Sequence, residues 1–291
     1  MARLSERLSE NAPGDFFVDA SCIDCETCRI LAPSVFTRSD RLGLSVVQRQ
    51  PATGDEALRA KMAIVSCPTS AIGTASKVDV RDAVDALPDP IAGEVFYCGY
   101  ASESSFGAAS YLVRRDGGNV LVDSPRAARP LMDRIAVLGG VGTMFLTHRD
   151  DVADHALYAR RFGCERVLHA RDLGPGTRDI ERRIEGDEPV ALAPDLLAVP
   201  VPGHTRGSVA LLYREEFLFT GDHLWGSEDG RGLEAGREVC WYSWAEQTRS
   251  MERLLAFDFE WVLPGHGPRF HAPGRKMRAE LESLVARMRR A

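Results

Sequence analysis

Residues 22–33 read CIDCETCRILAP, and this run places Cys22, Cys25 and Cys28 at intervals of three residues. Such short spacing lets one loop supply three thiolates to a single metal centre. Ala32 stands before Pro33, where a fourth cysteine is absent, so a four-sulfur site needs a ligand from farther along the chain. The stretch SCPTSAI, residues 66–72, supplies that ligand at Cys67.

Residues 14–75 resemble the single-cluster bacterial ferredoxins. The matching pieces are FFVDASCIDCETC (16–28), APSVF (32–36) and CPTSAI (67–72). In two-cluster ferredoxins the cysteine before the proline binds the other cluster, so Ala32 fits a protein with one cluster. The resemblance implies one [4Fe-4S] cluster on Cys22, Cys25, Cys28 and Cys67. The alternatives are a zinc knuckle and thiols without a metal.

Composition limits the class of protein. Of 291 residues, 44% are hydrophobic and 27% are charged, as in soluble globular proteins. The net charge of -6 offers no basic surface for nucleic acid or for an anionic membrane. The first fifteen residues lack the apolar core of a secretory signal, so we expect a cytoplasmic protein. Seven cysteines without an export signal favour metal or thiol chemistry over disulfides.

The chain changes character after the cysteine-rich part. Residues 74–94 are polar and carry two closely spaced prolines, which indicates a boundary. We therefore predict a small α+β domain over residues 1–80 and a second domain over 92–291. The second domain alternates strand-like and helix-like segments, with a hairpin turn at 116–119, which predicts an α/β layered fold with a mixed sheet.

Polar residues follow four apolar strands of the second domain. MFLTH ends at His148, LAVPVPGH at His204, FLFTGD at Asp222 and WVLPGH at His266. A strand holds a ligand at its end on a rigid support, and several such ends at one edge can build a metal site. One histidine of this kind is weak evidence, whereas the four together strongly indicate a metal centre.

Residues 92–291 resemble the metallo-β-lactamase superfamily, through LVDS (121–124), THRDDVADH (147–155), PGHTRGS (202–208), TGDHL (220–224) and LPGHG (263–267). The resemblance implies a four-layer αβ/βα sandwich that follows the ferredoxin domain, with two divalent metals at one edge.

The first metal-binding motif departs from the family's usual His-x-His-x-Asp-His. Residues 148–155 read HRDDVADH, so an aspartate replaces the second histidine and two residues are inserted before the last pair. Carried over by position, the first metal would be held by His148, Asp150 and His204. The second would be held by Asp154, His155 and His266, with Asp222 bridging the two. Asp151 competes with Asp150 for the ligand role, or caps a helix.

The substitution of carboxylate for imidazole makes the site harder, which suits iron or manganese as well as zinc. Two bridged cations lower the pKa of a bound water and polarise a carbonyl. The resemblance gives Asp154 the role of orienting this water or accepting its proton. Three nearby aromatic residues could roof the pocket or pack in the core: Trp241, Tyr242 and Trp244.

Two functions fit these features. The first is hydrolysis of a small ester, thioester or lactone, with the ferredoxin module as an appendage. The alternative is a redox enzyme in which the cluster exchanges electrons with a di-iron site, acting on oxygen, nitric oxide or sulfur compounds. The superfamily resemblance favours hydrolysis. Either function implies a small-molecule substrate, and the ferredoxin module offers a docking face for a redox partner protein.

Overall fold

The computed structural model of the protein describes residues 2–290, and the chain divides into two compact units. The first unit holds residues up to 141 together with 153–162, and the second holds 142–152 together with residues from 163 onward. The predicted domain boundary between residues 80 and 92 falls within the first unit and stays a prediction. Among residues 2–290 no helix is long and apolar enough to cross a membrane.

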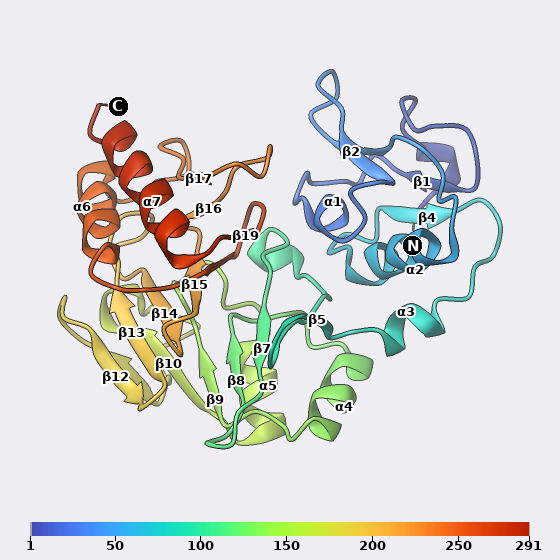
Figure 1. Cartoon of the computed structure of the whole chain (residues 1–291). Coiled ribbons are helices and arrows are strands. Elements are labelled where there is room, and N and C mark those ends of the chain that lie inside the picture. The colour runs from blue at the N-terminus through green and yellow to red at the C-terminus, as the bar shows by residue number, and fades with distance from the viewer. Residues whose placement is uncertain (1, 291) are drawn as a thin grey trace. The chain divides into compact units, whose positions relative to one another are not determined.

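The first 80 residues form two small antiparallel ladders and two helices (Figure 1). β1 (Phe16–Val18) pairs with β4 (Ile72–Thr74), and β2 (Phe36–Arg38) pairs with β3 (Ser45–Val47). The helices are α1 (Thr27–Leu31) and α2 (Gly54–Ser66), and a short 3-10 helix spans Leu4–Glu6. Because β1 and β4 are antiparallel, the loop that leaves β1 and the loop that enters β4 lie at the same end. Cys22 and Cys25 lie on the first of these loops and Cys67 lies on the second, whereas Cys28 lies in α1, which follows the first loop.

The rest of the first unit holds four strands in antiparallel succession. They are β5 (Asp89–Ala92), β6 (Val95–Tyr97), β7 (Tyr111–Val113) and β8 (Val120–Val122). β7 and β8 are buried at every position and form the predicted hairpin. The helices are α3 (Arg81–Asp85), α4 (Arg129–Val137) and α5 (His155–Phe162), and a 3-10 helix, Glu103–Ser105, lies between β6 and β7. α4 ends before two glycines with positive φ, as its sequence predicts.

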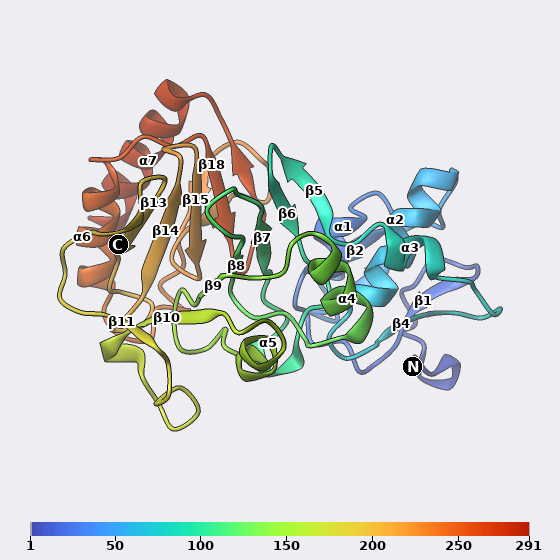
Figure 2. The same ribbon diagram turned by 90° about the horizontal axis from the view of Figure 1, so that it is seen from below.

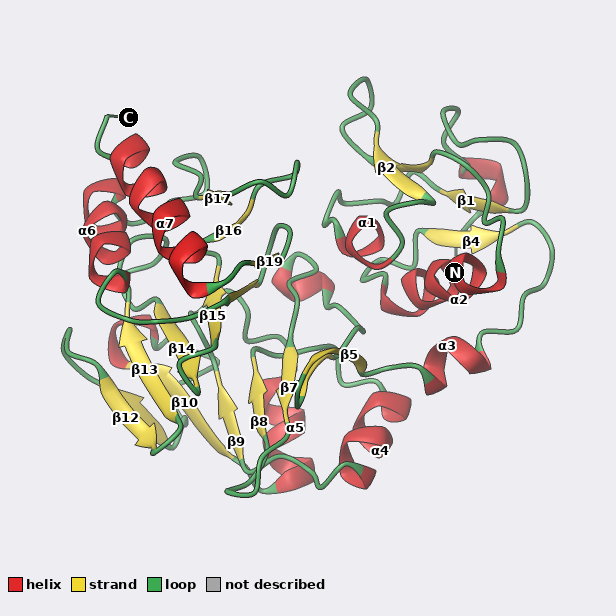
Figure 3. Cartoon of the chain, viewed as in Figure 1, coloured by secondary structure: helices red, strands yellow, loops and turns green. Residues whose placement is uncertain are grey.

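The second unit holds three parallel strands and a six-stranded sheet (Figure 3). The parallel strands are β9 (Thr143–Phe145), β10 (Glu165–His169) and β11 (Arg182–Ile184), with β10 in the middle. The larger sheet runs in the order β12 (Val190–Ala193), β13 (Leu196–Pro200), β14 (Val209–Tyr213), β15 (Phe217–Gly221), β18 (Trp261–Pro264), β19 (Phe270–His271). Its neighbours are antiparallel except for β15 and β18. β16 (Trp225–Gly226) pairs with β17 (Leu233–Glu234), and a 3-10 helix spans Ala170–Asp172.

Two helices cover one face of the six-stranded sheet, α6 (Trp244–Leu254) and α7 (Gly274–Met288) (Figure 2). A hydrophobic core fills the space between the sheet and these two helices. In it, strand residues such as Leu218 and Val262 pack against Met251 and Leu281 of the helices. α6 begins where the Ser243 side chain accepts a hydrogen bond from the amide of residue 246. This packed layer gives a rigid support to the loops at the strand ends.

The four ligands predicted at strand ends each follow closely on a strand of the second unit. β15 ends directly before Asp222, and β18 ends two residues before His266. β13 ends four residues before His204, and β9 ends three residues before His148. The strand that was predicted to end at His148 is therefore shorter than expected, because β9 ends at Phe145. The ladder of β9 with β10 stops at Phe145, so the residues from there to His148 form a turn.

Candidate functional site

Two glycine turns give the carboxylates of the site room to approach one another. Gly221 has a φ of +50°, and a Cβ added there would lie 2.5 Å from Thr147 Oγ1. A Cβ added at Gly265 would lie 2.7 Å from Asp222 Oδ1 and 2.8 Å from Asp151 Oδ2. Real Cβ atoms do not come so close, so both positions require glycine.

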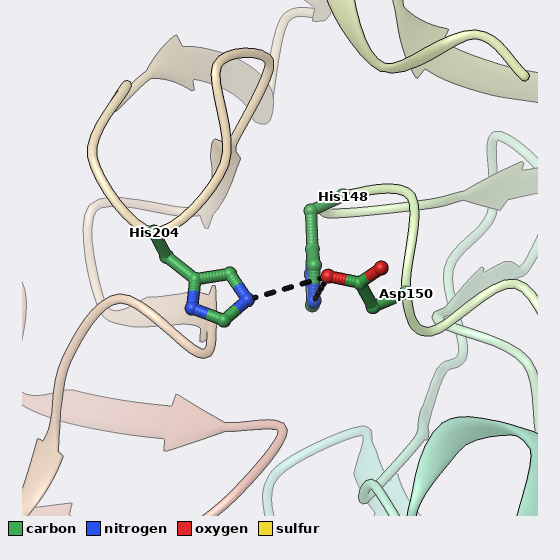
Figure 4. A group of neighbouring side chains, drawn as sticks. All are labelled: His148, Asp150 and His204. Atoms are coloured by element: carbon green, nitrogen blue, oxygen red, sulfur yellow. Dashed lines mark ion pairs between the residues drawn. The ribbon is translucent and has the colours of Figure 1, made fainter. Parts of the chain in front are cut away.

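His148, Asp150 and His204 form the first group of potential metal ligands (Figure 4). Asp150 Oδ2 lies 4.0 Å from His148 Nε2 and 3.6 Å from His204 Nε2. One ligand atom from each residue lies within 4.8 Å of the others, so a single cation could contact all three. Both histidines are buried, whereas the Asp150 side chain is 47% exposed, so the group meets solvent at Asp150.

His148, Asp151 and Asp222 form the second group. Asp151 Oδ2 lies 4.0 Å from His148 Nε2. Asp222 Oδ2 lies 3.6 Å from His148 Nε2, 3.7 Å from His204 Nε2 and 3.9 Å from His266 Nε2. A carboxylate among three imidazoles has the surroundings expected of a bridging ligand. The two neighbouring aspartates that compete by sequence thus lie in different groups.

Several buried atoms of these groups have no hydrogen-bond partner within residues 2–290, namely His148 Nε2, His204 Nε2 and Asp222 Oδ1. An unsatisfied buried polar atom costs about 1–3 kcal/mol, so three of them at one place indicate a site that binds an ion. Imidazole and carboxylate are ligands that zinc and iron both accept. The residues therefore fit a metal centre.

The electrostatics of the groups also suit cation binding. Burial lowers the pKa of His148, so its ring is neutral and Nε2 has a lone pair for a metal. Burial opposes a charge on His204 as well, but Asp150 and Asp222 outweigh it and raise the pKa of this ring. The contact with His204 lowers the pKa of Asp150. A bound cation would replace the proton that the carboxylates draw to His204.

A main-chain hydrogen bond fixes the orientation of His204. Its Nδ1 lies 2.6 Å from the carbonyl oxygen of Val239. Because a carbonyl only accepts, Nδ1 carries a hydrogen, and Nε2 is the nitrogen that faces the site and could bind a cation once it is deprotonated. The amides of Trp241 and Tyr242 both donate to the carbonyl of His204, each at 3.0 Å. Residues 239–242 therefore hold both the side chain and the main chain of His204.

Asp172 supports the site and was not among the residues predicted from sequence. This buried carboxylate accepts hydrogen bonds from the Arg149 amide at 3.0 Å, the Thr205 hydroxyl at 2.5 Å and the Gly207 amide at 2.8 Å. It thereby joins the loop after His148 to the loop after His204. The available signal was its position three residues after β10, where a polar residue follows an apolar strand.

The structure places Asp154 and His155 in the first unit, whereas the other six candidate ligands lie in the second. Within residues 2–290 neither residue belongs to the two ligand groups described above. Asp154 Oδ2 accepts a hydrogen bond from the Ala127 amide at 2.7 Å, and His155 is the first residue of α5. Their roles as ligands of the second metal, and that of Asp154 in catalysis, stay predictions.

The four predicted cluster ligands line one pocket of the first unit: Cys22, Cys25, Cys28 and Cys67. Burial raises the pKa of Cys25 to about 11 and that of Cys28 to about 12, so a bound metal would be needed to hold them as thiolates. Amides already approach two sulfurs: Asp24 N lies 3.4 Å from Cys22 Sγ, and Ala71 N lies 3.3 Å from Cys67 Sγ. The pocket fits a cluster bound by four cysteines.

The three aromatic residues near position 241 separate into two environments. Trp244 packs against the core of the second unit, and its indole donates to the Met288 carbonyl at 3.3 Å. Trp241 and Tyr242 are exposed, and the Trp241 ring centroid lies 6.1 Å from that of His204. Packing therefore explains Trp244, whereas Trp241 offers an apolar surface beside a candidate ligand.

Comparison with known proteins agrees with both halves of this description. Residues 18–74 match the 4Fe-4S single cluster domain of ferredoxin I. The chain is 37% identical over 134 residues to the hydroxyacylglutathione hydrolase of Anaeromyxobacter dehalogenans (strain 2CP-C), covering 44% of this chain and 50% of the relative. It is 34% identical over 138 residues to that of Fuscovulum blasticum, covering 44% and 51%. The chain thus spans about half the length of these curated relatives.

A solved structure supports the fold. The DIM-1 metallo-β-lactamase superposes with a TM-score of 0.51 at 17% sequence identity, covering 68% of this chain and 95% of that one. The predicted α/β fold class, a small ferredoxin domain followed by a metallo-β-lactamase sandwich, is confirmed. The chain therefore has a segment, residues 18–74, that matches the single-cluster 4Fe-4S ferredoxin domain, and it shares the metallo-β-lactamase fold.

Proposed function

We propose that the protein is a metal-dependent hydrolase of small esters, thioesters or lactones, with thioesters the first class to test. The observation that carries this proposal is the pair of ligand groups that share His148, with Asp222 close to three imidazoles. Hydroxyacylglutathione hydrolases act on a thioester by their name, and they are the curated relatives of this chain. Since the chain spans half of their length, the substrate is part of the proposal.

Two divalent metals would be held at the two groups, where they would polarise a substrate carbonyl and lower the pKa of a water. The residues of the chain fix the geometry. Val239 holds the His204 ring in the tautomer that binds, and Asp172 fixes the loops on both sides of it. The exposed Asp150 side chain lies where substrate enters from solvent.

The redox alternative has one observation in its favour. The two ligand groups contain three carboxylates: Asp150, Asp151 and Asp222. Oxygen ligands suit iron as well as zinc. A di-iron site in a chain that also carries a cluster-binding module would fit an enzyme that acts on oxygen, nitric oxide or sulfur compounds. The metal that the second unit binds separates the two functions.

The test uses the full-length chain, purified without oxygen, in the wild-type form and with Cys22 and Cys67 both changed to serine. The double variant should lack the cluster, so the metal that remains belongs to the groups around His148. About two zinc ions per chain, with turnover of hydroxyacyl thioesters, would support the hydrolase. About two iron ions per chain, with no turnover of esters, thioesters or lactones, would overturn it in favour of the redox function.

A further inference from the structure

We infer that the cluster site extends beyond the ferredoxin segment and includes the β6–β7 loop, residues 98–110, with Thr27 and Gly107 as positioning residues for the cluster. The ferredoxin match ends at residue 74, so this loop lies outside it. The loop and all four cysteines belong to the first unit. The inference goes beyond the proposed hydrolysis and does not depend on it.

The first contact is between Gly107 and Cys25. A Cβ added at Gly107 would lie 2.4 Å from Cys25 Cβ and 2.8 Å from Cys25 Sγ, and its φ is +86°. The main chain of the loop therefore lies directly against one of the four ligands, at a place where any side chain would collide with it. Glycine is required here for close approach, and the approach keeps water from this side of the sulfur.

The same loop also reaches the fourth ligand. The Ala101 amide donates to the Ser66 carbonyl at 3.1 Å, and a Cβ added at Gly107 would lie 3.4 Å from Pro68 Cγ. Ser66 and Pro68 are the two neighbours of Cys67 in the sequence. One loop from outside the ferredoxin segment thus contacts both the three-cysteine run and the two residues that flank the remote cysteine.

Internal hydrogen bonds stiffen the loop at this point. The Gly107 amide donates to the Ser102 carbonyl at 2.8 Å, and the Ala108 amide donates to the Ser105 carbonyl at 2.8 Å. We expect a turn held by these hydrogen bonds to open as one cooperative unit. A change at Gly107 is therefore expected to alter the protection of amides across residues 102–108.

Thr27 links the loop to the redox state of the cluster. Its hydroxyl donates to the Gly107 carbonyl at 3.2 Å, and the Cys25 thiol donates to Thr27 Oγ1 at 3.5 Å. When Cys25 is a thiolate ligand, one hydroxyl hydrogen has two acceptors. A low-potential one-electron donor that reduces the cluster adds negative charge to the sulfurs, so the hydrogen turns toward Cys25 and the bond to Gly107 weakens. The proton stays on Thr27, and no covalent bond changes.

Thermodynamic linkage makes this coupling reciprocal. If reduction of the cluster loosens the loop, then any interaction that holds the loop rigid makes the cluster harder to reduce. The hydrogen bond of Thr27 to sulfur favours the reduced state, because such bonds offset negative charge on the cluster. Loss of the hydroxyl should therefore lower the midpoint potential and remove the dependence of the loop on the redox state.

The test compares four full-length variants, purified without oxygen, with the wild type: Gly107→Ala, Thr27→Val, Thr27→Ser and Gly54→Ala. Thr27→Ser keeps the hydroxyl. Gly54→Ala is the matched glycine control, because a Cβ there meets nothing within 4 Å. The readouts are the midpoint potential, the rate of iron removal by a chelator, and amide hydrogen exchange in residues 98–110 with oxidised and dithionite-reduced protein.

We expect Gly107→Ala to lose iron about tenfold faster, the scale of effect seen for residues that support metal ligands. Thr27→Val should lower the potential and give the same loop exchange in both redox states, whereas Thr27→Ser and Gly54→Ala should match the wild type. Equal rates of iron loss for Gly107→Ala and Gly54→Ala would overturn the extended site. If Gly107→Ala does not fold, Thr27→Val decides alone: a potential and loop exchange equal to those of Thr27→Ser overturn the inference.

Discussion

Replacement of Gly265 by alanine tests the metal centre most directly. The φ of Gly265 is outside the left-handed region, so an alanine meets no backbone penalty there. The three nearest atoms are Asp222 Oδ1 at 2.7 Å, Asp151 Oδ2 at 2.8 Å and the Gly221 carbonyl carbon at 3.5 Å. Non-bonded contacts are favourable from about 3.5 Å, so each carboxylate must move by roughly 0.7 Å.

A movement of this size exceeds the tolerance of about 0.2 Å that metal–ligand distances allow. We expect the affinity for the metal to fall by about 10–100-fold, or about 1.4–2.7 kcal/mol, and hydrolysis to fall with metal occupancy. Calorimetric titration of the metal-free variant with zinc measures the affinity, and elemental analysis measures occupancy. Gly174→Ala is the control in the same unit, since a Cβ there meets nothing within 4 Å. Equal zinc affinity in the two variants, with both folded, would refute the reasoning.

Four further variants, at three positions, test other parts of the structure. Cys67→Ser should bleach the visible absorbance of the iron-sulfur cluster, because the change removes one of four sulfurs around the pocket; full cluster iron in the variant would contradict the four-cysteine assignment. Asp172→Ala deprives three donors of their acceptor and should lower the free energy of unfolding by about 3 kcal/mol, with a smaller loss in Asp172→Asn. Denaturant titration measures both, and a change under about 0.5 kcal/mol would show that the carboxylate does not support the loops. Trp241 is 62% exposed, so Trp241→Ala should leave the unfolding free energy unchanged while raising KM for thioesters with long acyl groups; an equal rise in KM for acetyl thioesters would exclude an apolar contact.

Local patterns predict the parts of the fold that depend on local physics. An apolar run followed by glycine and a ligand-type residue indicates a strand that ends beside a site, and Asp222 and His266 lie where this pattern puts them. The hairpin at residues 116–119 and the helix that stops before Gly139 follow in the same way. In each of these cases the decisive residues lie within a few positions of one another.

Contacts between distant segments carry no such local signal. Gly107 and Cys25 are more than 80 positions apart, and nothing around Gly107 in the sequence marks it as a neighbour of a cysteine. Asp172 has three donors from two other loops, and its role depends on the distance between those loops. In the sequence Gly265 looks like an ordinary turn residue. In the structure, its lack of a side chain lets the carboxylates of Asp151 and Asp222 lie next to its main chain. Only the packed structure identifies these residues.

The pair Asp150 and Asp151 shows why spacing did not resolve the ligand set. If residues 150–155 were helical, Asp151 and His155 would lie on one face of the helix, or Asp151 would cap it. α5 begins at His155, so neither role applies to Asp151. In the turn before that helix, consecutive side chains point different ways. One approaches His204, and the other approaches the turn at Gly265. Each ligand group thus has a carboxylate, and Asp222 adds a third that lies close to three imidazoles. Three negative charges balance most of the charge of two divalent ions, which favours a centre that holds both metals tightly even though one histidine of the usual motif is absent.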